Sequence, residues 1–153
     1  MSNPPIQADS VCQIGFIVSD IEAAAQKFCA IFGTAMPPIL LTSPNDEVTY
    51  KGAPSQATSK LAFFNAGQVQ IELIEPDEKP SVWRDFLNEH GEGIHHIAFG
   101  VKDTDETLRY LGGFGIEMVQ QGLYSDRSGV YTYLDATPQL GVIIELLQSF
   151  NRG

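Results

Sequence analysis

The sequence lacks the features that mark membrane and secreted proteins. It contains no run of about 18 apolar residues, the length that a membrane-spanning helix needs. The first ten residues, MSNPPIQADS, have neither the basic region nor the apolar region of a signal peptide. We therefore expect a cytoplasmic protein that has no membrane partner.

Cysteine and basic side chains are also scarce. The two cysteines, Cys12 and Cys29, lie among apolar neighbours, as free thiols in a reducing compartment do. Nine Lys and Arg residues stand against nineteen Asp and Glu residues, for a formal net charge of −10. A phosphate backbone requires a cationic surface, so we expect no nucleic-acid partner. With 43% hydrophobic residues in 153, the chain suits one globular domain or two half-size modules that share a core.

A strand followed by a helix occurs twice. VCQIGFIV (11–18) and IHHIAFGV (94–101) are typical of buried strands. Seven residues separate Gln13 from Asp20, and seven separate His96 from Asp103. A capping box at residues 19–22 and an acidic start at 103–106 predict helices that end at glycines. This is an internal repeat.

The ends of the two repeats correspond as well. QVQIELIEP (68–76) and GVIIELLQ (141–148) share the letters IEL, which places Glu72 and Glu145 at equivalent positions. Each half has room for two more strands and is therefore predicted to be β-α-β-β-β. The remaining elements are expected as strands at 39–43, 60–66, 117–125 and 129–136, a polar loop at 44–59, and a connecting helix at 80–90.

The predicted organisation is one structural domain made of two modules. The first module covers residues 10–76, the connecting helix lies within 77–92, and the second module covers 93–149. The fold class is α+β.

Four polar residues fall on the strand faces that do not pack on the helices. Alternation along a strand puts Gln13, Glu72, His96 and Glu145 on those faces, and it puts His95 on the helix side. Small residues such as Gly15, Ala98 and Gly100 lie beside them, which indicates a cavity.

A metal ion would explain both glutamates. A carboxylate within VIIELL must be charged and uncompensated, protonated, or paired with a cation, and these strands contain almost no Lys or Arg. A divalent ion such as Zn, Co, Ni, Mn or Mg accepts amide oxygen, carboxylate oxygen and imidazole nitrogen together. Taken singly, either Glu could lie on a solvent-facing side, and His96 could be a core histidine with its hydrogen bonds satisfied. Their equivalent places in a repeat favour the metal.

With these motifs the sequence resembles the vicinal oxygen chelate (glyoxalase, bleomycin resistance and dioxygenase) superfamily over about residues 10–149. FIVSDIEAAAQKFCAIFG, IELIEP and GEGIHHIAFGVKD are most similar to methylmalonyl-CoA epimerases and glyoxalase-like lyases. The resemblance implies paired βαβββ modules that form a cupped mixed sheet with helices outside, and a metal in the cup. Its ligand pattern falls on Gln13, Glu72, His96 and Glu145.

The resemblance also implies the class of reaction. Epimerases usually have His where this chain has Gln13, and a Glu base in a loop where this chain has Ser55 or Gln56. Glutathione lyases hold glutathione with Arg and Asn at positions that here are Ile17 and Pro76. A single ligand histidine argues against oxygen chemistry at iron, and the complete ligand set argues against a bleomycin-resistance protein.

We therefore expect a metal-dependent isomerase or epimerase that moves a proton next to a metal-polarised carbonyl. The expected substrate is a small molecule, methylmalonyl-CoA or another thioester. Glu145, or alternatively Glu72, would be the base, and Glu47 or Glu72 would act on the opposite face. A lactoylglutathione-lyase-like enzyme and a non-enzymatic ligand-binding protein remain the alternatives. We expect a homodimer, as relatives often are.

Overall fold

The computed structural model describes residues 3–44 and 46–150. Ten strands form a single sheet in the order β2-β5-β6-β1-β7-β10-β9-β8-β3-β4. The strands are β1 (Val11–Ile17), β2 (Leu40–Leu41), β3 (Val48–Tyr50), β4 (Ala53–Ser55), β5 (Ser59–Ala66), β6 (Val69–Pro76), β7 (Gly93–Gly100), β8 (Glu117–Leu123), β9 (Gly129–Ala136) and β10 (Val142–Ser149).

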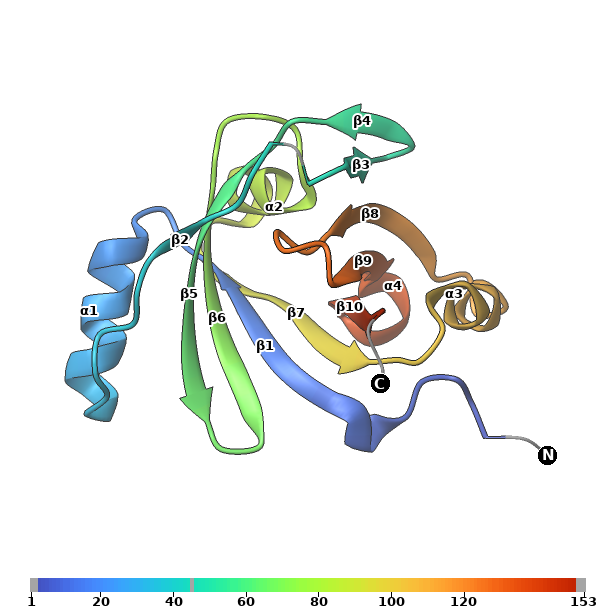
Figure 1. Ribbon diagram of the computed structural model, residues 1–153, viewed down its shortest axis with the longest axis horizontal. Coiled ribbons are helices and arrows are strands. Elements are labelled where there is room, and N and C mark those ends of the chain that lie inside the picture. Colours follow the sequence, from blue (N-terminus) through green and yellow to red (C-terminus); the bar gives the residue numbers. More distant parts are fainter. Residues whose placement is uncertain (1–2, 45, 151–153) are drawn as a thin grey trace.

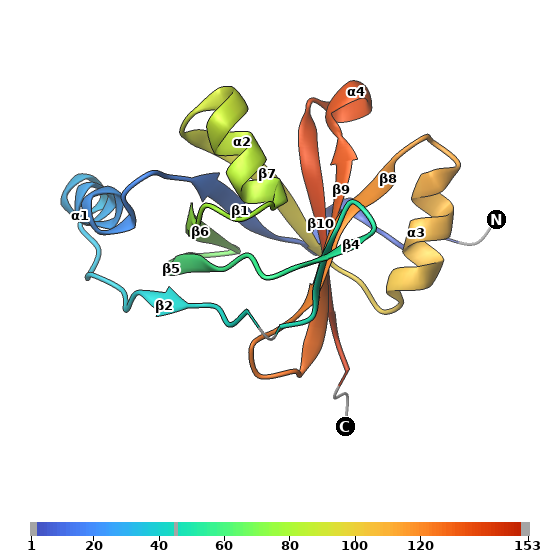
Figure 2. The same cartoon turned by 90° about the horizontal axis from the view of Figure 1, so that it is seen from above.

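The helices lie outside the curled sheet. They are α1 (Ile21–Phe32), α2 (Val82–His90), α3 (Thr104–Gly112) and α4 (Thr137–Leu140), with a 3-10 turn at Ala8–Ser10. Figure 1 shows α1 and α3 at opposite ends of the molecule, and Figure 2 shows the same separation from above. The predicted fold of paired βαβββ modules in a cupped sheet is confirmed. No helix in the described part of the chain is both long and apolar enough to cross a bilayer.

The two modules meet at β1 and β7, the strands that open the two repeats. These strands pair antiparallel, whereas β6 pairs parallel to β1 and β10 parallel to β7. The strands that open and close each module are therefore adjacent at the centre of the sheet. This arrangement brings the equivalent positions of both modules to one place.

The cores follow the predicted alternation of faces. Val18 and Phe16 pack with Ile21 and Ala25 of α1. Phe99 packs in a second cluster, which includes Leu111 of α3. A third cluster, inside the cup, joins both modules to α2 through Ile17, Ile74, Val82, Trp83 and Tyr133.

The helix ends agree with the sequence in all but one detail. Gly33 ends α1 at φ 67°, a left-handed conformation that suits glycine, and the Asp103 side chain accepts from the Glu106 amide to begin α3. The cap of α1 is Asp20, which accepts from the Ala23 amide, and not Ser19 as the capping box predicted. Cys12 and Cys29 are free thiols, half-buried.

The segment predicted as a polar loop contains a β-hairpin. Strands β3 and β4 are joined by Lys51 and Gly52, whose φ angles of 51° and 79° are those of a tight hairpin turn. The hairpin does not return to its own module, because β3 pairs with β8 of the second module. The strand expected at 39–43 is only two residues long.

Candidate metal centre

The four predicted ligands lie on four adjacent strands at the centre of the sheet. Gln13 is on β1, Glu72 on β6, His96 on β7 and Glu145 on β10. Their relative exposures are 6%, 7%, 0% and 4%. Strand pairing fixes the cluster, since Gly15 faces both Glu72 and His96, and Ala98 faces Glu145.

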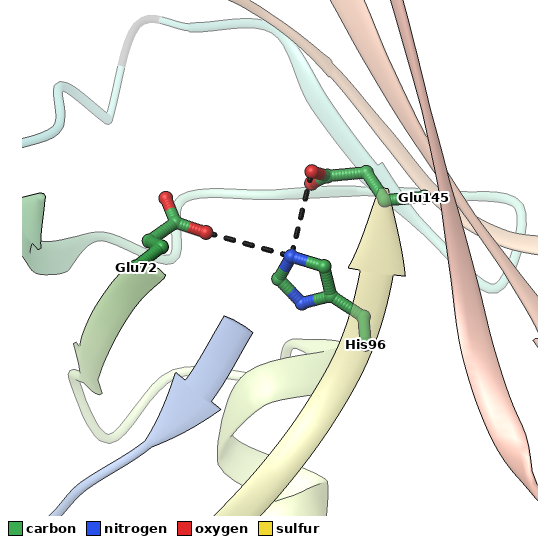
Figure 3. Close-up of side chains that lie close together, drawn as sticks. All are labelled: Glu72, His96 and Glu145. Carbon is green, nitrogen blue, oxygen red and sulfur yellow. Dashed lines mark ion pairs between the residues drawn. The ribbon is translucent and has the colours of Figure 1, made fainter. Parts of the chain in front are cut away.

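The side-chain ends converge on one point. His96 Nε2 lies 3.5 Å from an oxygen of Glu72 and 3.5 Å from an oxygen of Glu145. Figure 3 shows both carboxylates directed at the same ring nitrogen of His96. Gln13 Oε1 is 3.0 Å from His96 Nε2, and the same position of the amide is 3.2 Å from Glu72 and 3.0 Å from Glu145. The structure therefore brings all four residues together.

These contacts fit a metal ion. Gln13 Nε2 donates to Gln70 Oε1 at 2.8 Å, which turns Gln13 Oε1 toward three groups that are themselves acceptors. Acceptors that crowd together in this way repel one another unless a cation lies between them, whereas the reversed amide would donate to both carboxylates. Ligand atoms about 2.1 Å from a divalent ion are about 3.0–3.4 Å from one another. The donor set of amide oxygen, two carboxylates and imidazole suits Zn, Co, Ni, Mn or Mg.

A β-bulge brings the two histidines together. Gly15 pairs with His96 but Phe16 pairs with Ile94, so His95 is an extra residue on β7. Alternation had placed His95 on the helix side, away from His96, and that prediction is wrong because the bulge interrupts the alternation. His95 is 1% exposed, as expected of a packed residue, and its Nδ1 lies 2.9 Å from His96 Nδ1.

The contact between the histidines determines their tautomers. If His96 Nε2 faces a cation, the proton of His96 must be on Nδ1, and His95 Nδ1 must accept it. Burial lowers the pKa of His95 to about 3, and burial together with neighbouring His95 lowers the pKa of His96 well below its usual range. Both rings are therefore neutral, and His96 presents a lone pair to the cluster.

Gly15 makes room for a protein side chain. A Cβ at this position would lie 2.0 Å from Cε1 of His96. The interpretation of Gly15 as space for a ligand is therefore wrong, because the His96 ring occupies that space. Any larger residue at position 15 would displace the ring.

Tyr133 holds the ligands of the second module. Its hydroxyl accepts from Trp83 Nε1 at 3.0 Å and donates to Glu145, its cross-strand neighbour. The Tyr133 ring also packs edge-on against His96, with 5.1 Å between centroids. This role is not among the predictions from the sequence, although the alternation of GVYTYLDA places Tyr131 and Tyr133 on one face.

Burial changes the acidity of both carboxyl groups. Burial raises the pKa of Glu145 to about 8, and the hydrogen bond from Tyr133 opposes that change. Burial and the charge of Glu145 raise the pKa of Glu72 well above its usual range. Without a cation, at least one of the two carboxyl groups is therefore protonated at neutral pH.

A cavity of about 380 Å³ opens onto the cluster. Glu72, Glu145 and Gln13 line it, together with the buried Asp46. Its other walls are mainly apolar and aromatic: Val48, Ala57, Leu61, Phe63, Ile74, Trp83, Leu123, Tyr131, Tyr133 and Leu147.

Glu47, predicted as a second base, is not among the residues that line this cavity. Its side chain is 67% exposed and pairs with Arg127 at 3.2 Å. Its neighbour Asp46 points inward instead and accepts from the Ser43 amide and the Ser125 hydroxyl, each at 3.0 Å. Asp46 is not among the residues predicted from the sequence, since both acids belong to a stretch without clear periodicity.

A comparison with family models identifies a superfamily. Residues 12–133 match the family described as "Glyoxalase/Bleomycin resistance protein/Dioxygenase superfamily". Among curated proteins, an uncharacterized protein, YqjC, of Bacillus subtilis (strain 168) is 33% identical over 89 residues. That match covers 58% of this chain and 64% of the relative, which is less than two thirds of its length.

Several solved structures share the fold. The methylmalonyl-CoA epimerase of Mycobacterium tuberculosis superposes with a TM-score of 0.68 at 21% identity, covering 99% of this chain and 93% of its own. A hypothetical protein of Bacillus halodurans gives 0.65 at 26%, covering 94% and 96%. A Streptomyces coelicolor methylmalonyl-CoA epimerase variant in complex with 2-nitronate-propionyl-CoA gives 0.64 at 24%, covering 93% and 98%.

Proposed function

This chain belongs to the glyoxalase/bleomycin resistance protein/dioxygenase superfamily, and from that premise we propose that it is a metal-dependent isomerase or epimerase. The reaction would transfer a proton at the carbon next to the carbonyl of an acyl thioester. The observation that supports it is the convergence of Gln13, Glu72, His96 and Glu145 on one point at the edge of a mainly apolar cavity. The structural relatives named as methylmalonyl-CoA epimerases suggest the first thioester to test.

The proposed ligands are Gln13, Glu72, His96 and Glu145. A bound divalent ion supplies a Lewis acid that polarises a carbonyl and acidifies the neighbouring C–H bond. Gln13 and His96 contribute no charge, and His95 keeps the His96 lone pair directed at the centre. The apolar walls exclude water from the reacting carbon.

Glu145 and Glu72 are the proposed proton-transfer groups. They approach the cluster from different modules, so the two carboxylates flank it. Burial raises the pKa of Glu145 in the metal-free protein, which favours this carboxyl group as a proton acceptor. Glu72 then serves the opposite face in place of Glu47, whose carboxylate lies outside the cavity.

The test is exchange of the α-proton. Protein loaded in turn with Zn, Co, Ni, Mn and Mg is incubated with methylmalonyl-CoA or another 2-substituted acyl-CoA in deuterated water, and NMR follows loss of the α-proton signal. We expect exchange in the wild type and none in Glu145→Gln. Absence of exchange with every metal and every thioester would refute the proposal.

A lactoylglutathione-lyase-like activity is a second candidate because its ligand set resembles Gln, Glu, His and Glu. Ile17 is fully buried in the cup cluster and Pro76 is buried, so neither position offers the polar groups that such lyases direct at glutathione. The hemithioacetal of methylglyoxal and glutathione is the substrate that distinguishes it. Ligand binding by protein that contains no metal as purified would favour a non-enzymatic binding protein instead.

We also propose a homodimer. Ile31, Phe32 and Leu41 are 73%, 66% and 71% exposed, and they lie on the end of α1 and on the edge strand β2. Light scattering after size-exclusion chromatography would give the mass directly.

A further inference from the structure

We propose that the part of the substrate that reaches the metal centre is uncharged. Next to the thioester it would carry a hydroxyl or a second carbonyl, and no carboxylate. This inference rests on the proposed function, since it concerns the group bound at that centre. It goes further by separating the substrate from methylmalonyl-CoA, whose reacting end is anionic.

The charges of the proposed metal centre balance. Glu72 and Glu145 together offset both positive charges of a divalent ion, while Gln13 and the neutral His96 add none. The loaded centre therefore has no net charge. A carboxylate from the substrate would make it negative in a place where Glu72, His96 and Glu145 are nearly inaccessible to water.

The described wall of the cavity carries negative and not positive side chains. It contains one more carboxylate, Asp46, which is 7% exposed and accepts hydrogen bonds from Ser43 and Ser125. Among the described residues that line the cavity, none is Lys or Arg. An anionic substrate would therefore meet a neutral metal centre, the additional carboxylate of Asp46 and no cationic side chain in the described wall.

Basic side chains elsewhere on the cup are engaged with other partners. Arg127 lies 3.2 Å from Glu47, and Lys51 lies 3.7 Å from Asp85. Lys60 pairs with Glu75 at 3.6 Å on the face of β5 opposite to the cavity-lining Leu61. These pairs place the positive charges away from the cavity.

The polar groups of the cavity suit an uncharged ligand. They include hydroxyl groups of Thr42, Ser59 and Tyr131. Ser59 Oγ has no hydrogen-bond partner in the part of the chain that the structure describes. Hydroxyl groups both donate and accept, so they pair readily with alcohol and carbonyl groups.

Three thioesters test the inference, because they differ only in the group on the α-carbon. Methylmalonyl-CoA carries a carboxylate there, lactoyl-CoA a hydroxyl, and isobutyryl-CoA a methyl group. Dissociation constants are measured with Co²⁺-loaded protein through the fluorescence of Trp83, the only tryptophan, which lines the cavity. The cobalt absorption spectrum reports in parallel whether the thioester enters the coordination sphere.

We expect lactoyl-CoA to bind most tightly and methylmalonyl-CoA to bind about tenfold or more weakly than isobutyryl-CoA. Asp46→Asn should strengthen methylmalonyl-CoA binding about threefold or more while lactoyl-CoA changes little. Glu47→Gln is the matched control, since it removes the same charge one residue away but outside the cavity. If Asp46→Asn does not fold, Glu72→Gln keeps an oxygen ligand and also removes one negative charge, so it should likewise strengthen methylmalonyl-CoA binding.

Methylmalonyl-CoA binding as tightly as isobutyryl-CoA in the wild type would overturn the inference. So would an Asp46→Asn variant whose methylmalonyl-CoA binding is no stronger than that of Glu47→Gln, confirmed by an equally unchanged Glu72→Gln. Failure of the proposed function looks different: no thioester would exchange its α-proton, whatever the order of binding.

Discussion

The two modules contribute two residues each to the cluster, but the residues of the second module have more buried hydrogen-bond and packing partners. The first module provides Gln13 and Glu72, and the second provides His96 and Glu145, at equivalent positions of β1, β6, β7 and β10. His96 is held by His95 and packed under Tyr133, and Glu145 accepts from Tyr133. The first-module ligands have less support. Gln13 is held by an exposed residue, Gln70. With the Gln13 oxygen turned toward the cluster, no residue in the described part of the chain donates a hydrogen bond to the Glu72 carboxylate.

This difference shows that side chains at equivalent positions of a repeat can be held with different rigidity. A ligand with buried partners keeps its geometry when the ion leaves, whereas a ligand without them can move. The second module therefore acts as the rigid half of the centre. The first module provides the adjustable half of the proposed centre, and Glu72 is the carboxylate with fewer buried partners.

The largest expected effect is the loss of metal affinity when His96, in the second module, is replaced. His96→Ala removes the ligand that has the most buried partners, and we expect metal affinity to fall by more than about 100-fold, beyond the range typical of an outer partner. Gln13→Ala should reduce affinity much less, because a water molecule can replace an amide oxygen. Competition with a chromogenic chelator measures both values. Equal losses would contradict the distinction between rigid and adjustable halves.

The next effect concerns Tyr133. Replacing it with Phe removes the hydroxyl that holds Glu145 and keeps the ring, so we expect metal affinity to fall about 10- to 100-fold. Tyr131→Phe is the matched control: its hydroxyl accepts from Gln120 and not from a ligand, and the expected change is less than about threefold. Titration calorimetry gives both constants. A loss in Tyr131→Phe as large as in Tyr133→Phe would show that the hydroxyl of Tyr133 has no special role.

The stability of the metal-free protein should depend on pH through the same carboxyl groups. The pKa of Glu145 is raised by folding, to about 8, so the folded state binds more protons and the free energy of unfolding decreases as pH rises toward that value. The lowered pKa of His96 acts in the opposite direction only below its ordinary range near pH 6.5. Between pH 6.5 and 8 we therefore expect a loss of about 2 kcal/mol.

Urea unfolding of chelator-treated protein measures this slope. Glu145→Gln should remove most of it, and bound metal should reverse it, because the ion favours the charged carboxylates. Stability that rises over this interval in the metal-free protein would contradict the assignment.

The smallest expected effect on metal binding concerns Gln70, the partner of Gln13 in the first module. Gln70 is exposed and makes one hydrogen bond to Gln13, so Gln70→Ala should weaken metal binding only about threefold. The chelator assay resolves such a change. A loss as large as that in Tyr133→Phe would mean that the Gln13 amide is as firmly held as Glu145.

The fold could be predicted because its signals are local and repeated. Alternation in VCQIGFIV and GVYTYLDA, and the glycine after α1, depend on neighbours a few residues apart. The convergence of Gln13, Glu72, His96 and Glu145 followed from the repeat, since equivalent strands of paired modules meet at the centre of the sheet.

The features that escaped prediction depend on interactions across the chain. The bulge at His95 arises from pairing between β1 and β7, and no local pattern in GIHHIAFG marks it. The β3–β4 hairpin crosses to β8, which lies about 70 residues away. The inward turn of Asp46 and the outward turn of Glu47 depend on that crossing, because the Leu123 amide of β8 donates to the Asp46 carbonyl.

The crossing hairpin has a consequence for how the two halves of this protein can be separated. β3 belongs to the first module by sequence but extends the sheet of the second, and Asp46 reaches the cavity from that connection. Residues of both halves therefore line the cavity. Tyr50 of β3 also donates a hydrogen bond to Asp85 of α2. Neither half expressed alone would contain a complete binding site, even though each carries half of the ligands. The two modules have the same arrangement of strands and helix, but the crossing hairpin makes the cavity depend on both of them.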